Sequence, residues 1–136
     1  MALENEIKNN IKENLINFRK ANGLTQYETA TALKMKDAST YRSWETGRSS
    51  PKNSMLVRIA RMYNTSVDKI LTNRDDYKSS KQHKVSSHID FDREIYGDEY
   101  LSELERSEKL FIMKFRQLNA KDKQKVAEFL DEVLPE

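Results

Sequence analysis

Apolar residues in the first half of the chain recur at intervals of three and four, the spacing that places them on one face of an α-helix. The first such run predicts a helix of about four turns that ends at Asn22-Gly23, because glycine readily adopts the left-handed conformation of a C-terminal cap. Its apolar face comprises Ile7, Ile11, Leu15 and Phe18. Next, Thr25 and Glu28 have the spacing of a capping box, which predicts a second helix that runs to about Lys34.

Three more helices are expected before residue 73. The third begins near residues 37–39, where side-chain oxygens can cap it, and stops at Gly47. Because proline is tolerated in a first helical turn, Ser49-Ser50-Pro51 predicts the start of the fourth helix, and Ser66 is expected to cap a short fifth one. The apolar faces of the last two helices comprise Met55, Leu56, Ile59, Ala60 and Tyr63, followed by Val67, Ile70 and Leu71.

The pattern changes after these helices. Residues 73–97 offer little to bury and predict a linker, although the alternation of Ile89-Asp90-Phe91-Asp92 leaves a short strand open. Helical spacing returns over residues 98–135, where two apolar stripes predict a helical hairpin. We therefore expect an all-α fold with a helical domain over residues 6–72, a linker over 73–97 and a C-terminal helical hairpin over 98–135. The stripes comprise Leu101, Leu104, Phe111, Phe115 and Leu118, and then Val126, Phe129, Leu130, Val133 and Leu134.

Charge is divided between the two halves of the chain. The net charge of the 136 residues is +2, but residues 1–74 carry +6 and residues 75–136 carry −4. A basic first half favours a polyanion as its partner, and only for that half. The longest run of aliphatic and aromatic residues, 110–113, is far shorter than the ~20 residues of a membrane span. Without a signal pattern at the N-terminus, we expect a soluble, cytoplasmic protein.

No catalytic or metal-binding set of residues is evident. The absence of cysteine excludes disulfides, thiolate metal sites and cysteine nucleophiles. There is no glycine-rich phosphate loop and no serine elbow, and His83 and His88 lack companion ligands. We expect neither an enzyme nor a bound metal or cofactor.

The second and third predicted helices, joined by a short turn, carry the candidate chemistry. The small side chain of Ala30 lets the two helices cross closely, and Leu33, Tyr41 and Trp44 supply apolar contacts that hold the crossing. A helix fits the major groove of B-DNA, where hydroxyl and guanidinium groups can bond to base edges. The free face of the third helix carries such groups on Ser39, Thr40, Arg42 and Ser43.

Residues 8–72 resemble the helix-turn-helix regulators of the lambda-repressor and Cro type, also called the xenobiotic-response-element family. The resemblance implies a five-helix lambda-repressor-like domain, binding to double-stranded DNA and a role as a transcriptional regulator, more often a repressor. It rests on Arg19, Gly23-Leu24-Thr25-Gln26, Ala30, Leu33, Trp44-Glu45-x-Gly47, Pro51, Leu56-x-x-Ile59-Ala60 and Ser66-Val67-Asp68-Lys69-Ile70-Leu71.

The chain departs from the family pattern between Leu33 and Trp44. It has one additional residue there, and Lys34 stands where the family has a glycine. This departure predicts a longer turn or a later start of the third helix. Counting back from Glu45 places the base-reading positions at Ser39, Thr40, Arg42 and Ser43.

We call Ser39, Thr40, Arg42 and Ser43 the reading face. The resemblance also implies roles for residues outside it. Arg19 and Glu45 match a partly buried ion pair, and Gln26 matches a glutamine that binds the DNA backbone. Arg48 and Lys52 are expected at the other side of the groove. Tyr27 and Lys36 are further candidates for DNA contact.

Dimers of this family bind two half-sites about one helical turn, ~34 Å, apart, so we expect a homodimer on an inverted repeat. The hairpin is the expected dimer contact, through Phe111, Phe115, Phe129 and Leu130. In the alternative, the hairpin packs on its own N-terminal domain and the fifth helix dimerises. A second function also stays open, that of an antitoxin or anti-repressor whose C-terminal half binds another protein.

Overall fold

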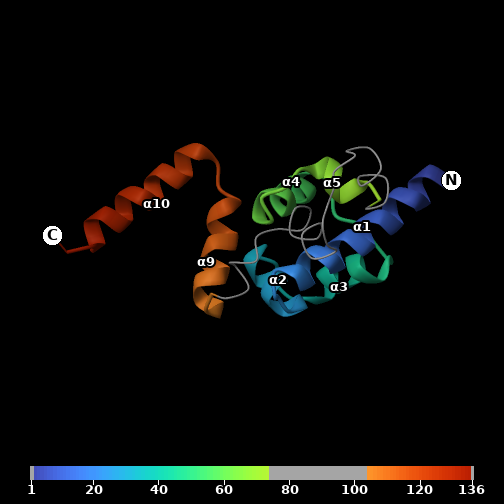
Figure 1. Ribbon diagram of the computed structural model, residues 1–136, viewed down its shortest axis with the longest axis horizontal. Coiled ribbons are helices and arrows are strands. Elements are labelled where there is room, and N and C mark those ends of the chain that lie inside the picture. The colour runs from blue at the N-terminus through green and yellow to red at the C-terminus, as the bar shows by residue number, and fades with distance from the viewer. Residues whose placement is uncertain (1, 74–103, 136) are drawn as a thin grey trace, which may run out of the picture.

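The computed structural model describes residues 2–73 and 104–135, which form α-helices and no strand. The all-α prediction is therefore confirmed for the part of the chain that the structure describes. Apart from Asn73, the predicted linker, the alternative strand at 89–92 and both histidines lie outside the described residues. The helices (Figure 1) are α1 (Ala2–Ala21), α2 (Gln26–Ala32), α3 (Ser39–Thr46), α4 (Asn53–Met62), α5 (Val67–Leu71), α9 (Arg106–Arg116) and α10 (Ala120–Val133).

Capping residues set most of the helix ends where the sequence predicts them. Gly23 and Gly47 follow α1 and α3 with φ values of +67° and +82°, a left-handed conformation that costs glycine little. Thr25 and Glu28 form the predicted capping box of α2, with bonds of 3.0 Å and 2.9 Å. The hydroxyl of Ser66 caps α5.

Two predicted boundaries are wrong by about one half-turn. The second helix ends at Ala32 and not near Lys34, because Lys34 has a φ of +59° and cannot continue a right-handed helix. The fourth helix begins at Asn53, so Pro51 precedes the helix and does not lie in its first turn. Pro51 is instead buried against the domain.

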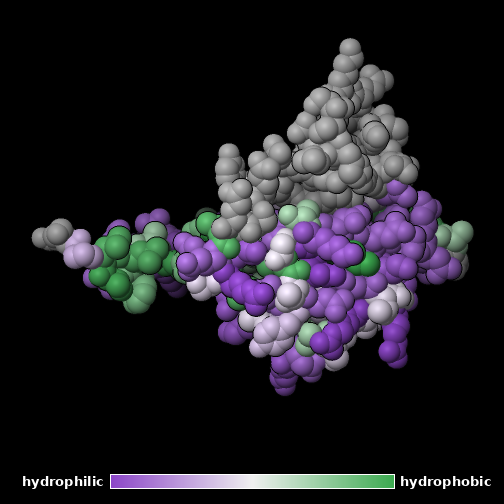
Figure 2. All heavy atoms as spheres, turned by 60° about the horizontal axis from the view of Figure 1, so that its bottom comes forward, coloured by the Kyte–Doolittle hydropathy of each residue, from purple (hydrophilic) through white to green (hydrophobic). Residues whose placement is uncertain are grey.

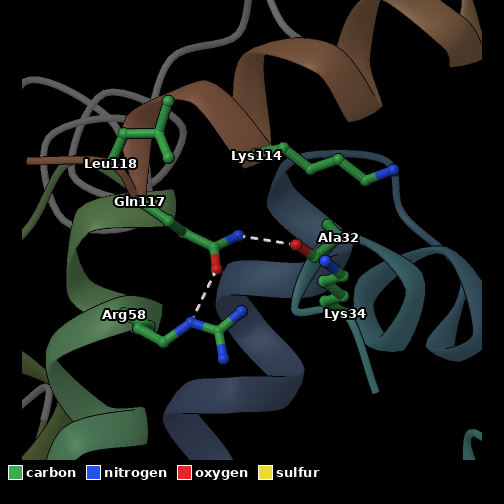
Figure 3. A pocket seen from close by; sticks show the side chains of 6 residues that line it. All are labelled: Ala32, Lys34, Arg58, Lys114, Gln117 and Leu118. Carbon is green, nitrogen blue, oxygen red and sulfur yellow. Dashed lines mark hydrogen bonds between the residues drawn. The ribbon is translucent and has the colours of Figure 1, made fainter. Parts of the chain in front are cut away.

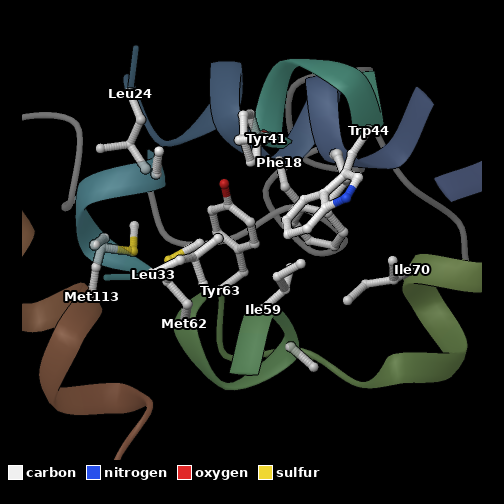
Figure 4. Close-up of a cluster of buried hydrophobic side chains, with 14 of the residues drawn as sticks. Phe18, Leu24, Leu33, Tyr41, Trp44, Ile59, Met62, Tyr63, Ile70 and Met113 are labelled. Atoms are coloured by element: carbon white, nitrogen blue, oxygen red, sulfur yellow. The ribbon is translucent and has the colours of Figure 1, made fainter. Parts of the chain in front are cut away.

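The core of the domain lies between α1, α3 and α4 (Figure 4). Phe18 of α1 stacks on Tyr63 at the end of α4, with ring centroids 5.0 Å apart, and Tyr41 meets Trp44 edge to face at 5.7 Å. Tyr41 and Trp44 are both buried. They therefore hold the helix crossing, as expected, and do not belong to an exposed face.

Two buried asparagines of α1 fasten α5 to the domain. Asn14 Nδ2 donates to the carbonyl oxygens of Ile70 at 2.8 Å and Thr72 at 2.7 Å, and Asn10 Nδ2 donates to that of Leu71 at 3.1 Å. The carbonyls at the end of a helix have no partner within the helix. The asparagines supply these partners, which explains polar side chains on the core-facing side of α1.

The C-terminal helices are present, but they do not form the expected hairpin. α9 packs on α2 and α4, and its Met113 is fully buried beside Leu33 and Met62 (Figure 4). α10 makes little contact with α9, has no buried residue and projects from the domain (Figure 1). α9 can bury one face on its own N-terminal domain, whereas α10 meets no apolar surface there. The alternative of packing on the same chain therefore holds for α9.

Apolar side chains gather on the projecting helix α10, at the end of the molecule opposite the N-terminus (Figure 2). They include Phe129, which is 62% exposed, together with Leu130, Val133 and Leu134. Among the described helices, none has the length and apolar character of a membrane span.

Candidate nucleic-acid interface

Helix α3 has one buried and one open face. Its buried residues are Tyr41, Trp44 and Glu45. The four predicted base-reading residues lie on the other side, where Ser39, Thr40 and Arg42 are exposed and Ser43 is half-buried. The structure thus brings these four side chains onto one surface, as counting back from Glu45 predicts.

The additional residue before α3 lengthens the turn and delays the start of the helix. Lys34 adopts the left-handed conformation that a glycine would favour at this position. Asp37 Oδ1 accepts a hydrogen bond of 2.8 Å from the backbone N–H of Ser39 and another from its hydroxyl. These bonds lower the pKa of Asp37 and leave its carboxylate at the N-terminus of α3.

The polar groups of the reading face differ in how far they are engaged by the protein. The Ser43 hydroxyl donates to the carbonyl oxygen of Thr40 at 2.6 Å and is hydrogen-bonded to the Ser49 hydroxyl. Arg42 is exposed and forms no ion pair with any residue in 2–73 or 104–135. Its guanidinium group is therefore the strongest donor available on this face for bidentate contact with a base.

A buried ion pair fixes α3 against α1 and α2. Arg19 donates from Nε to Glu45 Oε2 at 2.7 Å and from Nη2 to Oε1 at 3.0 Å, the pairing that the resemblance implies. Arg19 Nη1 also donates to the carbonyl oxygen of Leu24 at 3.0 Å. Gln26 Nε2 donates to Glu45 Oε1 at 3.0 Å, so this glutamine joins the same network.

The network determines the charge state of the carboxylate. Burial by itself would raise the pKa of Glu45, but hydrogen bonds from Arg19 and Gln26 stabilise the ionised form, and the net effect lowers the pKa. The hydrogen bond to Glu45 raises the pKa of Arg19. Both groups are therefore charged at neutral pH, and the bidentate geometry sets the rotation of α3 about its axis.

The predicted backbone contacts lie on both sides of the reading face. Arg48 and Lys52, which follow α3, are exposed, as is Lys36 in the turn before it. Tyr27 on the first turn of α2 is 69% exposed, although aromatic rings are usually buried. Gln26 is half-buried and is held by Glu45 at the N-terminus of α2.

The four predicted dimer residues divide into two groups. Phe111 and Phe115 of α9 stack on each other at 6.2 Å, and the ammonium of Lys123 lies 5.5 Å from the Phe115 ring. Phe129 and Leu130 lie on α10 and are exposed. Within one chain these two groups do not form a common core.

Sequence patterns did not indicate how α9 is attached to the helix-turn-helix. Gln117 Nε2 donates to the carbonyl oxygen of Ala32 at 2.7 Å and its Oε1 accepts from Arg58 Nε at 3.0 Å (Figure 3). Arg58 Nη2 donates to the carbonyl oxygen of Leu33 at 2.6 Å. At the other end of α2, the buried Lys109 donates from Nζ to the carbonyl oxygen of Gly23 at 3.2 Å. No local signal marks these partners, because they lie 25 to 86 residues apart in the sequence.

The five-helix domain and the open face of α3 define a helix-turn-helix DNA-binding domain of the lambda-repressor type. A comparison with protein families agrees, because residues 15–70 match the helix-turn-helix family. This domain belongs to that family, and the protein is a DNA-binding transcriptional regulator. None of the curated proteins and none of the solved structures matches the chain.

Proposed function

We propose that the protein is a transcriptional repressor that binds an inverted repeat in double-stranded DNA as a homodimer. The observation that carries this proposal is the open face of α3, where Arg42 is exposed between the cations Lys36 and Arg48 and forms no ion pair within the described part of the chain. In the proposed complex, Ser39, Thr40, Arg42 and Ser43 contact base edges in the major groove. Backbone contacts come from Gln26, Tyr27, Lys36, Arg48 and Lys52.

The proposed roles separate discrimination from affinity. Contacts to base edges distinguish one sequence from another, whereas contacts to phosphates strengthen binding to all sequences and make it depend on salt. Arg42 is on the reading face and Arg48 is beyond it, so the two arginines should behave differently. The Arg19–Glu45 pair takes no part in contact and keeps the reading face in position.

The apolar surface of α10 supports self-association. Burying a large apolar side chain contributes about 1.5–3 kcal/mol, and Phe129 and Leu130 remain exposed in the single chain. In the proposed dimer these side chains pack against the partner copy together with Phe111 and Phe115. One domain reads a half-site, and two joined domains read an inverted repeat.

DNA binding is tested by gel-shift titration against the DNA upstream of the protein's own reading frame, over a series of salt concentrations. Arg42→Ala should lower the discrimination between this DNA and unrelated DNA by about 1–3 kcal/mol. Arg48→Ala should weaken binding to both DNAs by the same factor. If both variants bind like the parent protein, the assignment of the reading face is wrong.

Self-association is tested by sedimentation of a variant that carries Phe111→Asp and Phe129→Asp. We expect a folded monomer whose affinity for the full inverted repeat falls to that for one half-site. A variant that stays a folded dimer would refute this interface and favour dimerisation through α5. If the parent protein is itself monomeric, the apolar face fits the antitoxin or anti-repressor function, in which another protein covers α10.

A further inference from the structure

A hollow of about 360 Å³ lies beside the turn of the helix-turn-helix. One wall is the outer face of α2, with Tyr27 and Thr31, and another is the turn itself, with Lys34 and Lys36. Lys114 of α9 also lines the hollow. A residue from a helix beyond the family match at 15–70 therefore lines the same surface as two proposed DNA contacts.

The lining of this hollow is basic. Lys34, Lys36 and Lys114 are exposed, and none of them forms an ion pair with a residue in the described ranges. Asp37 is the one acidic residue of the lining, and its carboxylate is engaged by the backbone N–H and hydroxyl of Ser39. Three lysines against one engaged carboxylate favour an anion as the occupant.

The position of Lys114 relative to α2 is fixed by its neighbours on α9. Met113 is fully buried against the domain, and Gln117 bonds to the carbonyl oxygen of Ala32 and to Arg58. Lys114 lines one pocket with Ala32 and Lys34 (Figure 3), and it lines the hollow described above with Lys36 and Asp37 of the turn before α3. The contacts of Met113 and Gln117 thus fix this part of α9 against α2 and α4.

We propose that Lys114, together with Lys34 and Lys36, binds phosphates of the DNA backbone beside the groove that α3 reads. This inference rests on the proposed function and extends the DNA interface onto α9. The lysines could otherwise serve only to balance the negative C-terminal end of α2. A free phosphate ion has the same chemistry as a phosphate of the DNA backbone. The test therefore distinguishes DNA contact, binding of a free ion and a purely structural role of the lysines.

The test is the salt dependence of DNA binding by the full chain, on the upstream DNA and on an unrelated 30-base-pair duplex. Each phosphate contact contributes about 0.9 to the slope of log affinity against log salt. Lys114→Gln should lower that slope by about 0.9 and the affinity near 0.1 M salt by about five- to tenfold, equally for both duplexes. Lys125→Gln, which removes one exposed cation from α10, should behave like the parent protein.

The outcomes separate this inference from the function on which it rests. If the parent protein binds its upstream DNA with a steep salt dependence and Lys114→Gln leaves the slope unchanged, the contact is refuted and the function stands. If the parent protein does not bind DNA, both are refuted. Stabilisation of the parent by millimolar inorganic phosphate, lost in Lys114→Gln without a change in slope, would overturn the DNA contact in favour of a free ion. An unchanged melting temperature of the variant confirms that it is folded.

Discussion

Replacing Met113 by alanine tests whether α9 is part of the core of the DNA-binding domain. Met113 is fully buried beside Leu33 and Met62, although it follows the domain by some 40 residues of sequence. If α9 is only an appendage, truncating this side chain has no effect on the domain. If α9 completes the core, the domain loses stability.

The expected loss follows from the size of the side chain and its surroundings. Buried methionine-to-alanine substitutions cost about 2–5 kcal/mol, and the cost depends on how far the site can collapse. Because α9 lies on the surface of the domain and can shift inward, we expect about 2–3 kcal/mol. At a urea dependence of roughly 2 kcal/mol per molar for a chain of this size, the unfolding midpoint falls by about 1–1.5 M.

The assay uses a reporter inside the domain. Trp44 is the one tryptophan of the sequence and is buried on α3, so its fluorescence follows unfolding of the helix-turn-helix itself. Met113→Leu is the matched control, because it keeps the apolar volume and should cost less than about 1.5 kcal/mol. An unchanged Trp44 midpoint in Met113→Ala would show that α9 does not support the domain.

Three other substitutions have defined outcomes. Lys34→Gly should raise the free energy of unfolding by about 0.5–1 kcal/mol, because glycine adopts the left-handed conformation of this position without strain. Asn64→Gly, at a φ of +55°, should raise it by less. An unchanged free energy of unfolding in Lys34→Gly would refute backbone strain at this residue. Glu45 has a lowered pKa, so its ionised form stabilises the fold above its ordinary pKa of about 4.3, and this contribution is lost as the pH falls through the folded-state value. Glu45→Gln should therefore lower the free energy of unfolding by about 3 kcal/mol at pH 7, and by progressively less toward pH 3, in urea titrations. A loss that does not depend on pH would contradict a stabilising Arg19–Glu45 ion pair. Asn14→Leu should cost about 2 kcal/mol in the same assay, because it leaves buried carbonyls without donors; an unchanged midpoint would mean that water replaces the side chain.

Local chemistry was enough to predict the five helices of the domain and the two faces of α3. The capping box at Thr25 and the left-handed Gly47 act within a few residues, so their effect can be read from short stretches of sequence. The apolar spacing of α3 buries Trp44 and exposes Arg42 for the same reason. Lys34 was recognised as a departure, and its left-handed conformation explains how the turn tolerates the missing glycine.

The partner of a helix could not be predicted in the same way. An apolar stripe indicates a face that favours burial, but it does not show which surface covers that face. The apolar stripes of α9 and α10 fit packing in a hairpin as well as they fit packing on the N-terminal domain. In the structure, α9 docks on α2 and α4 through Met113 and Gln117. The polar residues Asn14 and Gln117 were missed because each satisfies carbonyls more than 50 residues away.

The docking of α9 also changes how the division of charge should be understood. Residues 75–136 carry a net charge of −4. From this charge alone, we expected only the first half of the chain to contact a polyanion. α9 itself contains four basic residues, Arg106, Lys109, Lys114 and Arg116, and one acidic residue, Glu108. This basic helix is packed on the basic domain, so the acidic character of the second half belongs to the residues around it. In the proposed complex, α9 continues the basic surface of the domain that approaches DNA, so the proposed DNA-binding part of the molecule includes α9.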